Sequence, residues 1–262
     1  MAYSFYLNTI CTNKIGILTT QHEEVERIIE QIQHKTISER GNRVFYEGVF
    51  DGVDIVVAFS HWGKVAAALT TSILLQEFKV DRLVSMGIAS AVVPELNVGD
   101  IVVAQRLFQH DMDMRPLFRR YEIPLRGVTS FVTPENELQL ATDAVHNFLK
   151  QAKELRKELV DYNILAPKLQ LGDIASGDLF ITGASRKATI NRNLPSVLCA
   201  DMESAAIAQA CADFQVPCVF IRTIAEGTNE DADVESEARF KSELAVQYNY
   251  FILQSLLQLL AQ

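Results

Sequence analysis

The chain has 262 residues, of which 48% are hydrophobic and 22% are charged, a composition typical of a globular protein with a large core. Its formal net charge is -9, and it contains no block of Lys or Arg, which argues against a nucleic-acid groove. No run approaches the roughly 18–20 apolar residues of a membrane helix, so we expect no membrane partner either.

The sequence shows no pattern typical of a secretory signal or of a metal site. Met1–Asn13 lacks a basic start and a long apolar core, so we interpret it as a short N-terminal extension and not as a secretory signal. Four cysteines show no CxxC spacing, and Cys199 and Cys218 lie in apolar runs, as expected of free thiols in a reducing cytoplasm. The five His are scattered without an HxxxH pair, so we expect no metal and no other cofactor.

Strands alternate with helices along the rest of the chain. Short apolar runs predict strands at Lys14–Leu18, Val44–Phe50, Val53–Ser60, Arg82–Met86, Ile101–Leu107, Leu169–Ser176, Val197–Ala200 and Pro217–Ile224. Longer runs predict helices at His22–Ile32, Val65–Phe78, Glu137–Leu159, Ser185–Asn191, Glu203–Phe214 and Val234–Ala261. This alternation predicts one α/β domain over residues 14–262, with a mainly parallel or mixed sheet and helices on both faces.

Two connections have their own signals. Asp51-Gly52 separates two of the predicted strands and is typical of a tight hairpin turn. Between residues 115 and 135 the periodicity fades, which predicts a long loop, and long ordered loops are usually lids or interfaces.

Unusual polar residues stand where apolar strands end. Asp178, Glu203, Arg222 and Glu226 all lie within a few residues of a predicted strand end, where ligand sites of α/β proteins form. The run Gly87–Ala91 consists of small residues and Ile88, and such a run lets a ligand approach the backbone, so Ala89 is a candidate binding residue.

Each of the strongest candidates has a structural as well as a functional interpretation. Glu203 is either a helix N-cap or a carboxylate that accepts hydrogen bonds from a ribose diol. Phe180 is either a core residue or a stacking face for a flat base, with the backbone of Ile181 reading the base edge. Glu226 is either a solvated turn residue or a buried acid that protonates a leaving base. Glu23 and Glu24 also have a structural interpretation, since acidic residues in a first helical turn are favoured by the helix dipole.

Seven short motifs occur in one order over nearly the whole chain. They are Lys-Ile-Gly-Ile…Glu-Glu-Val, Gly-Lys-Val-Ala-Ala-Ala, Asn-Val-Gly-Asp-Ile-Val-Val, His-Asp-x-Asp, Ser-Gly-Asp-x-Phe-Ile, Met-Glu-Ser-Ala-Ala-Ile-Ala and Val-Pro-x-Val-x-x-Arg-x-Ile. This order resembles the nucleoside phosphorylase/nucleosidase superfamily, and most closely its 5′-methylthioadenosine/S-adenosylhomocysteine nucleosidases. The resemblance implies a single domain with a twisted central sheet, usually a homodimer, and release of adenine from a nucleoside substrate.

The resemblance also implies roles for individual residues. Glu24 matches the Glu that positions and activates the attacking water, and Glu203 matches the Glu that binds the ribose hydroxyls, with Met202 beside it. Phe180 matches the aromatic residue that stacks on the base, and Ile181 matches the residue whose backbone reads adenine.

Two further matches concern the sugar and its 5′ substituent. Arg222 matches an Arg at the ribose end of the site. The loop around Met114, Leu117 and Phe118 matches a segment that reaches into the 5′-substituent pocket of the partner subunit.

The chain departs from the family pattern inside the expected pocket. The proton donor of the family is an Asp within Arg-x-Ile-Ser-Asp, and here Ala225 and Glu226 replace the Ser and the Asp. Ile88 replaces a Ser near the water and ribose, and Gln21 replaces an apolar Met against the sugar. An acid displaced by about 1 Å can lower the rate 10²-fold. The longer side chain of Glu226 therefore implies a reshaped pocket, a base other than adenine, or slow turnover. Glu230 and Asp231 are alternative donors that rank below Glu226.

Three hypotheses follow. The first is hydrolysis of a 5′-substituted adenine nucleoside, and the second is the same chemistry on another purine nucleoside or nucleotide. For the second, Arg115, Arg119 and Arg120 either face a 5′ anion or belong to a solvated loop. The third is a nucleoside-binding protein without turnover. The resemblance also disfavours phosphorolysis: phosphorylases of this superfamily hold phosphate with Arg residues near the glycine-rich loops, and no Arg stands directly before Met86 or directly after Gly16.

Overall fold

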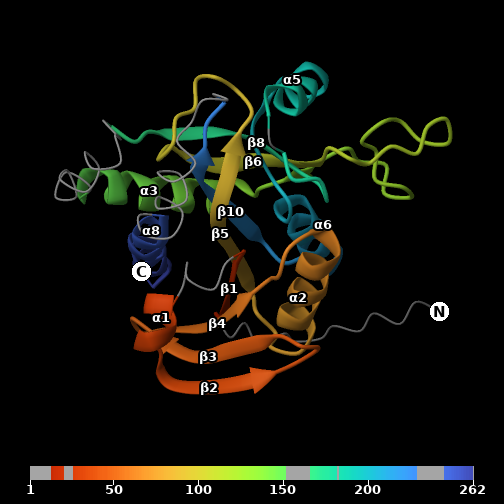
Figure 1. The fold of residues 1–262 in the computed structure, drawn as a ribbon. Coiled ribbons are helices and arrows are strands. Elements are labelled where there is room, and N and C mark those ends of the chain that lie inside the picture. Colours follow the sequence, from red (N-terminus) through yellow and green to blue (C-terminus); the bar gives the residue numbers. More distant parts are fainter. Residues whose placement is uncertain (1–12, 21–25, 152–165, 182, 229–244, 262) are drawn as a thin grey trace, which may run out of the picture.

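A twisted sheet with helices on both sides forms the computed structural model of this chain (Figure 1). The structure describes residues 13–20, 26–151, 166–181, 183–228 and 245–261, and every structural statement below refers to them. None of the described helices combines the length and the apolarity that a bilayer crossing requires.

The strands follow the short apolar runs of the sequence. They are β1 (Ile15–Thr19), β2 (Gln33–Glu39), β3 (Val44–Phe50), β4 (Val53–Phe59), β5 (Arg82–Ala91), β6 (Ile101–Gln109), β7 (Phe131–Val132), β8 (Leu169–Ser176), β9 (Val197–Asp201) and β10 (Cys218–Glu226). The helices are α1 (Glu26–Gln31), α2 (Lys64–Gln76), α3 (Glu135–Gln151), α5 (Ala184–Asn193), α6 (Ser204–Phe214) and α8 (Ala245–Leu260). The predicted α/β class with one domain and a mixed sheet is therefore confirmed.

Strand β5 has three partners in the described sheet. It pairs in parallel with β1 and β10 and antiparallel with β9. Strand β10 also pairs with β6, which continues through β8 to β9, so these five strands form a closed ring of pairings. From β5 the sheet extends the other way through β1, β4, β3 and β2. The ring brings the ends of β5, β9 and β10 together.

Two hydrophobic cores fill the two sides of the sheet, and alternation along each strand assigns residues to one or the other. In β10, Val219 and Ile221 pack with α3 and α8, whereas Phe220 and Ile224 pack with α2 and α6. Figure 1 shows α3 and α8 on one side of the sheet and α2 and α6 on the other. Because side chains alternate between faces, Arg222 points toward the α6 side.

The predicted hairpin at Asp51-Gly52 is present, with both residues at positive φ, as a type I′ turn requires.

Several predicted boundaries differ from the structure. Strand β5, however, does not end at Met86 but continues to Ala91, because Gly87–Ala91 pairs with β10 and then β9. Strand β2 was not predicted, because its residues are mostly exposed and carry no apolar pattern.

Other predictions fall partly outside the described residues. The structure describes the long predicted helices from Glu135 to Gln151 and from Ala245 to Leu260, and the remaining parts of both lie outside it. The N-terminal extension at residues 1–13 stays a prediction, as does its boundary with the domain.

Candidate active site

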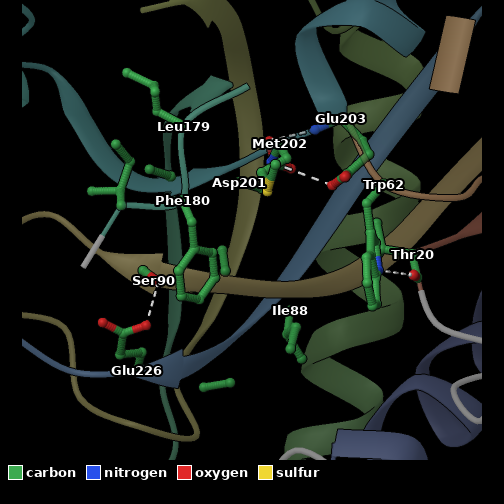
Figure 2. A pocket seen from close by; sticks show the side chains of 14 residues that line it. Thr20, Trp62, Ile88, Ser90, Leu179, Phe180, Asp201, Met202, Glu203 and Glu226 are labelled. Carbon is green, nitrogen blue, oxygen red and sulfur yellow. Dashed lines mark hydrogen bonds between the residues drawn. The ribbon is translucent and has the colours of Figure 1, made fainter. Parts of the chain in front are cut away.

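A cavity of about 420 Å³ lies where several strands end. Residues at the ends of β5, β9 and β10, and in the segments that follow β1, β4 and β8, form its wall (Figure 2). The lining residues are Thr20, Trp62, Ile88, Ala89, Ser90, Leu179, Phe180, Ile181, Ala200, Asp201, Met202, Glu203, Ala225 and Glu226. The predicted binding residues Phe180, Ile181, Met202, Glu203 and Ala89 and the predicted acid Glu226 thus surround one space.

Glu203 precedes α6 but does not cap that helix with its side chain. Its Oε1 accepts a hydrogen bond from the backbone N–H of Gly63 at 2.8 Å, and its Oε2 accepts one from Met202 at 3.3 Å. Burial and, to a smaller extent, the charge of Asp201 raise the pKa of the Glu203 carboxyl to about 7. The side chain therefore faces the cavity as a buried carboxyl, and Glu203 occupies the N-cap position of α6 without a side-chain cap hydrogen bond.

Gly63 is needed where it stands. Its φ is 89°, which disfavours other residues, and an added Cβ would come within 3.0 Å of the Asp178 carboxylate. Asp178 accepts a hydrogen bond from the N–H of Lys64 at 2.8 Å, at the start of α2. Asp178, which the sequence marked as an unusual strand-end residue, therefore fixes the α2 terminus and does not line the cavity.

Arg222 lies behind the cavity wall and not on it. Its guanidinium is fully buried and uses all five N–H groups on Asp201, Ser204, Ile221 and Ser85. The expected direct contact with ribose is therefore contradicted, because no donor is left for a ligand. Arg222 instead holds the Asp201 carboxylate, with Nε 2.8 Å from Oδ2.

Asp201 connects this buried cation to Glu203. Its Oδ1 accepts hydrogen bonds from the Ser176 hydroxyl at 2.5 Å and from the backbone N–H of Glu203 at 3.3 Å. It also accepts one from the hydroxyl of Ser204. The network fixes the backbone that carries Glu203. The sequence placed Asp201 directly after a buried strand, but gave no sign that its partner was Arg222.

Phe180 is not a core residue. It is 59% exposed, and Figure 2 shows its ring within the cavity. Ile181, by contrast, is buried and packs with Ile190 of α5 and with Leu194, which follows that helix. The loop therefore presents the aromatic ring to the cavity while the next residue anchors it.

Glu226 is the last residue of β10 and lines the cavity. Its Oε2 accepts a hydrogen bond from the Ser90 hydroxyl at 2.9 Å, and its Oε1 accepts one from the Lys187 ammonium at 3.1 Å. A hydroxyl partner is therefore present even though Ala225 stands where the family pattern has Ser. Ser90 and Lys187 were not predicted as site residues.

Trp62 also escaped prediction, although it is the single tryptophan of the chain and follows a strand. Its indole is 70% exposed, lines the cavity and donates a hydrogen bond to the carbonyl of Thr20 at 3.0 Å. An exposed indole beside a cavity provides apolar surface for a ligand.

Some candidates cannot be placed in this site. Glu24, Gln21, Glu230 and Asp231 lie outside the described residues. Arg115 and Arg119 line a separate hollow with Leu117 and Phe118 rather than the main cavity. Among the described residues, no three His, Cys, Asp or Glu side chains are grouped as metal ligands would be.

Comparison with known proteins agrees with this geometry. The phosphorylase superfamily matches residues 14–257. The aminodeoxyfutalosine nucleosidase of Campylobacter jejuni is 32% identical over 239 residues, which cover 91% of this chain and 96% of the relative.

Solved structures give the same result. A methylthioadenosine/S-adenosylhomocysteine nucleosidase from Colwellia psychrerythraea, in complex with adenine, superimposes with a TM-score of 0.82 at 27% identity, covering 94% of this chain and 95% of the other. The futalosine hydrolase of Helicobacter pylori superimposes with a TM-score of 0.78 at 30% identity, covering 94% of this chain and 98% of the other. The chain therefore belongs to the phosphorylase superfamily and is an N-glycosyl hydrolase of the nucleosidase type.

Proposed function

We propose that this enzyme hydrolyses the N-glycosidic bond of a 5′-substituted adenine nucleoside of the methylthioadenosine or S-adenosylhomocysteine type. The observation that carries the proposal is the single cavity that holds an exposed Phe180 ring together with the carboxyl groups of Glu203 and Glu226. In the view of Figure 2 the two carboxyl groups stand at opposite ends of the cavity, with the ring between them.

The sugar end of the reaction belongs to Glu203. An ionised carboxylate accepts hydrogen bonds from both ribose hydroxyls, and these bonds strengthen as the sugar approaches an oxocarbenium ion. The fixed acceptor position supports this role, since Gly63 and Met202 hold the carboxylate in place. Ala89, on the β5 strand end, offers a small side chain where the substrate lies against the backbone.

The base end belongs to Phe180, Ile181 and Glu226. The phenyl ring provides a stacking face for adenine, and the backbone of Ile181 lies beside it to read the base edge. Adenine is a poor leaving group as an anion, so a proton from Glu226 at N7 lets it leave neutral. Such general acid catalysis contributes roughly 10²–10⁴-fold.

Water is the proposed nucleophile, with Glu24 as its general base on the strength of the family pattern. Among the described residues that line the cavity there is no Arg, Lys or His. A phosphate ion there would meet carboxylates with no cation on the described cavity wall to bind it, which favours hydrolysis over phosphorolysis.

A second candidate substrate is an aminodeoxyfutalosine-type nucleoside. The observation in its favour is the Campylobacter jejuni relative, an aminodeoxyfutalosine nucleosidase that is 32% identical to this chain. Ile88 and Glu226, which replace the Ser and the Asp of the family pattern, both line the cavity.

We also propose that the enzyme is a homodimer in a reducing cytoplasm. Exposed apolar side chains on α2 and α6, namely Val65, Leu69 and Phe214, support a partner surface. The buried free thiols of Cys199 and Cys218 support the location. Light scattering that gives the mass of one chain would exclude the dimer, and recovery in a membrane or secreted fraction would exclude the cytoplasm.

A substrate panel tests the proposal. Purified protein is incubated with methylthioadenosine, S-adenosylhomocysteine, aminodeoxyfutalosine and the 6-oxopurine counterpart of methylthioadenosine, and base release is followed by ultraviolet absorbance. We expect kcat/KM for the first two to be highest. A much higher value for aminodeoxyfutalosine would transfer the proposal to the second candidate. No base release from any compound, with binding still measurable by calorimetry, would leave a nucleoside-binding protein.

A further inference from the structure

Helix α5 buries a lysine. The helix reads Ala-Ser-Arg-Lys-Ala-Thr-Ile-Asn-Arg-Asn, and nearly all of its side chains are polar or small. Lys187 and Ile190 lie three residues apart on one helix face, and both are buried. Lys187 therefore occupies a position that the fold gives to apolar residues. A lysine is almost never fully buried unless it is paired.

The partner of Lys187 is the candidate acid of the site. The Nζ atom lies 3.1 Å from Glu226 Oε1, and the Lys187 side chain is only 5% exposed. The same ammonium donates a hydrogen bond to the carbonyl of Gly227, the residue after β10. In the described part of the chain, Glu226 is the one carboxylate within ion-pair distance of Lys187.

This pairing changes what Glu226 can do. Its two carboxyl oxygens accept hydrogen bonds from the Ser90 hydroxyl and from the Lys187 ammonium, so in this structure the group acts as an acceptor on both sides. An ionised carboxylate accepts hydrogen bonds but has no proton to give. If Glu226 is the acid that assists the leaving base, its proton must come from a neighbour. Ser90, on the other oxygen, is a poor source because a hydroxyl is far less acidic than an ammonium.

We propose that Lys187 is a positioning residue that holds Glu226 at the base end of the cavity and supplies, through its carboxyl group, the proton taken up by the leaving base. This inference rests on the proposed function. It adds a proton source on α5 to a reaction otherwise described with carboxylates alone.

The proton transfer balances as follows. The bond between C1′ and the base nitrogen breaks, and its electron pair leaves with the base. One N–H bond of Lys187 breaks as an O–H bond forms on Glu226, and that O–H bond breaks as N7–H forms on the base. Lys187 ends as a neutral amine, Glu226 is again a carboxylate, and solvent restores the ammonium proton after the base departs. Lysine suits this role because its proton is exchangeable at accessible pH, whereas that of arginine is not.

Other charges around the cavity are accounted for. Asp201 and Glu203 also line it, and Asp201 is held by the buried Arg222. Glu203 binds backbone N–H groups at the opposite end of the cavity in Figure 2. Neither forms a hydrogen bond or an ion pair with Lys187 among the described residues. A loss of rate that accompanies the loss of Lys187 is therefore assigned to the Lys187–Glu226 pair.

Two substrates separate proton supply from structural support. Methylthioadenosine needs a proton on its leaving base, whereas the phenolate of a 4-nitrophenyl ribofuranoside leaves without one. We expect Lys187→Met to lower kcat for methylthioadenosine by roughly 10²-fold or more and to change the rate on the activated riboside less than about threefold. Arg192→Met is the matched control, because it removes an exposed cation from the same helix, and both rates should stay unchanged.

The difference between the two substrates is the deciding readout, because a merely structural role of Lys187 would lower both rates. Equal losses on both substrates would overturn the proposal. So would full activity on methylthioadenosine. If the Met variant does not fold, Lys187→Gln replaces it, because Gln keeps a hydrogen-bond donor to Glu226 without the charge. The same loss on methylthioadenosine and the same unchanged rate on the activated riboside are then expected, and the same results would overturn the proposal. If the wild-type enzyme itself releases no purine, the proposed function fails first.

Discussion

At the scale of single residues, the carboxyl group of Glu203 links stability to function. Burial keeps its pKa near 7 in the folded protein, above its ordinary value of 4.5. Between these values the folded state holds a proton that the unfolded chain has released. Stability therefore falls as pH rises from about 4.5 to about 7, and stays lower above that. This lower stability at neutral pH is the consequence of burying a hydrogen-bond acceptor in the cavity.

Glu203→Gln tests that link. The amide cannot ionise, so the variant should gain melting temperature relative to wild type at pH 8 and gain less at pH 5, as scanning calorimetry would show. Nucleoside binding should weaken roughly 10- to 100-fold, because hydrogen bonds to a charged acceptor are lost. A difference in melting temperature that is the same at both pH values would contradict the raised pKa.

Phe180 offers a separate test at the base end. Phe180→Ala removes the exposed ring, and stacking on an aromatic side chain is worth about 1–3 kcal/mol per base, so the dissociation constant for adenine nucleosides should rise about 5- to 150-fold. Phe180→Tyr keeps the ring and serves as the control. Calorimetric titration measures both. Unchanged binding by the Ala variant would remove Phe180 from the site.

The sequence allowed some of these residues to be found and not others. Glu203, Phe180 and Glu226 each follow an apolar run, so the position of the strand end points to them. Lys187 carries no such signal, because a lysine in a polar helix is normally solvent-exposed, and only the packing of α5 buries it. Trp62 lies in the short connection between β4 and α2, where the sequence pattern does not show where a side chain points.

At the scale of elements, the junction between β9 and α6 depends on the buried pair of Asp201 and Arg222. Both side chains are almost completely buried, and the five donors of the guanidinium are all used. The alternation along β10 places Arg222 on the α6 side, where Ser204 also contacts it. The position of Arg222 was predictable in the sequence, but its role was not, because its partners come from three other elements.

Arg222→Met should therefore destabilise the fold strongly. Removing one member of a buried pair leaves Asp201 as an uncompensated charge, so the free energy of unfolding at pH 7 should fall by about 3–5 kcal/mol in denaturant titrations. Arg40→Met breaks an exposed pair with Glu77, with both side chains about half exposed, and should cost about 1 kcal/mol or less. Similar losses in the two variants would refute this account of the junction.

Element boundaries were less predictable than element types. Strand β5 continues through Gly87–Ala91 because β10 and β9 pair with it there, and such long-range pairing leaves no local trace. Strand β2 lacks apolar alternation and forms because β3 offers an edge.

At the scale of the whole molecule, one side presents exposed apolar residues. Val65 and Leu69 are 72% and 52% exposed on α2, and Leu117 is 78% exposed on the segment that follows β6. In Figure 1 that segment extends from the body on the side where α2 and α6 lie. Apolar surface of this kind is typical of a protein interface.

Leu69→Glu should weaken the proposed homodimer, because it places a charge in the apolar surface of α2. Light scattering should show a single-chain mass at concentrations where wild type is dimeric, and KM for methylthioadenosine should rise, since the family pattern puts part of the partner near the 5′ substituent. Lys79→Glu, a charge change outside this surface, is the control. A dimer that persists unchanged would place the interface elsewhere.

The fold class was predictable from the alternation of strands and helices, because that order admits few architectures. The closed ring of β5, β9, β8, β6 and β10 was not, since its closure depends on which distant strands pair. The ring is what collects Glu203, Phe180 and Glu226 around one cavity.

The central claim is that water cleaves the N-glycosidic bond in that cavity. Incubation of the enzyme with methylthioadenosine in ¹⁸O-labelled water containing phosphate, followed by mass spectrometry of both products, tests it directly. If water is the nucleophile, the products are unlabelled adenine and a methylthioribose that carries one ¹⁸O atom at C1. A sugar 1-phosphate, or the absence of any cleavage product, would contradict it.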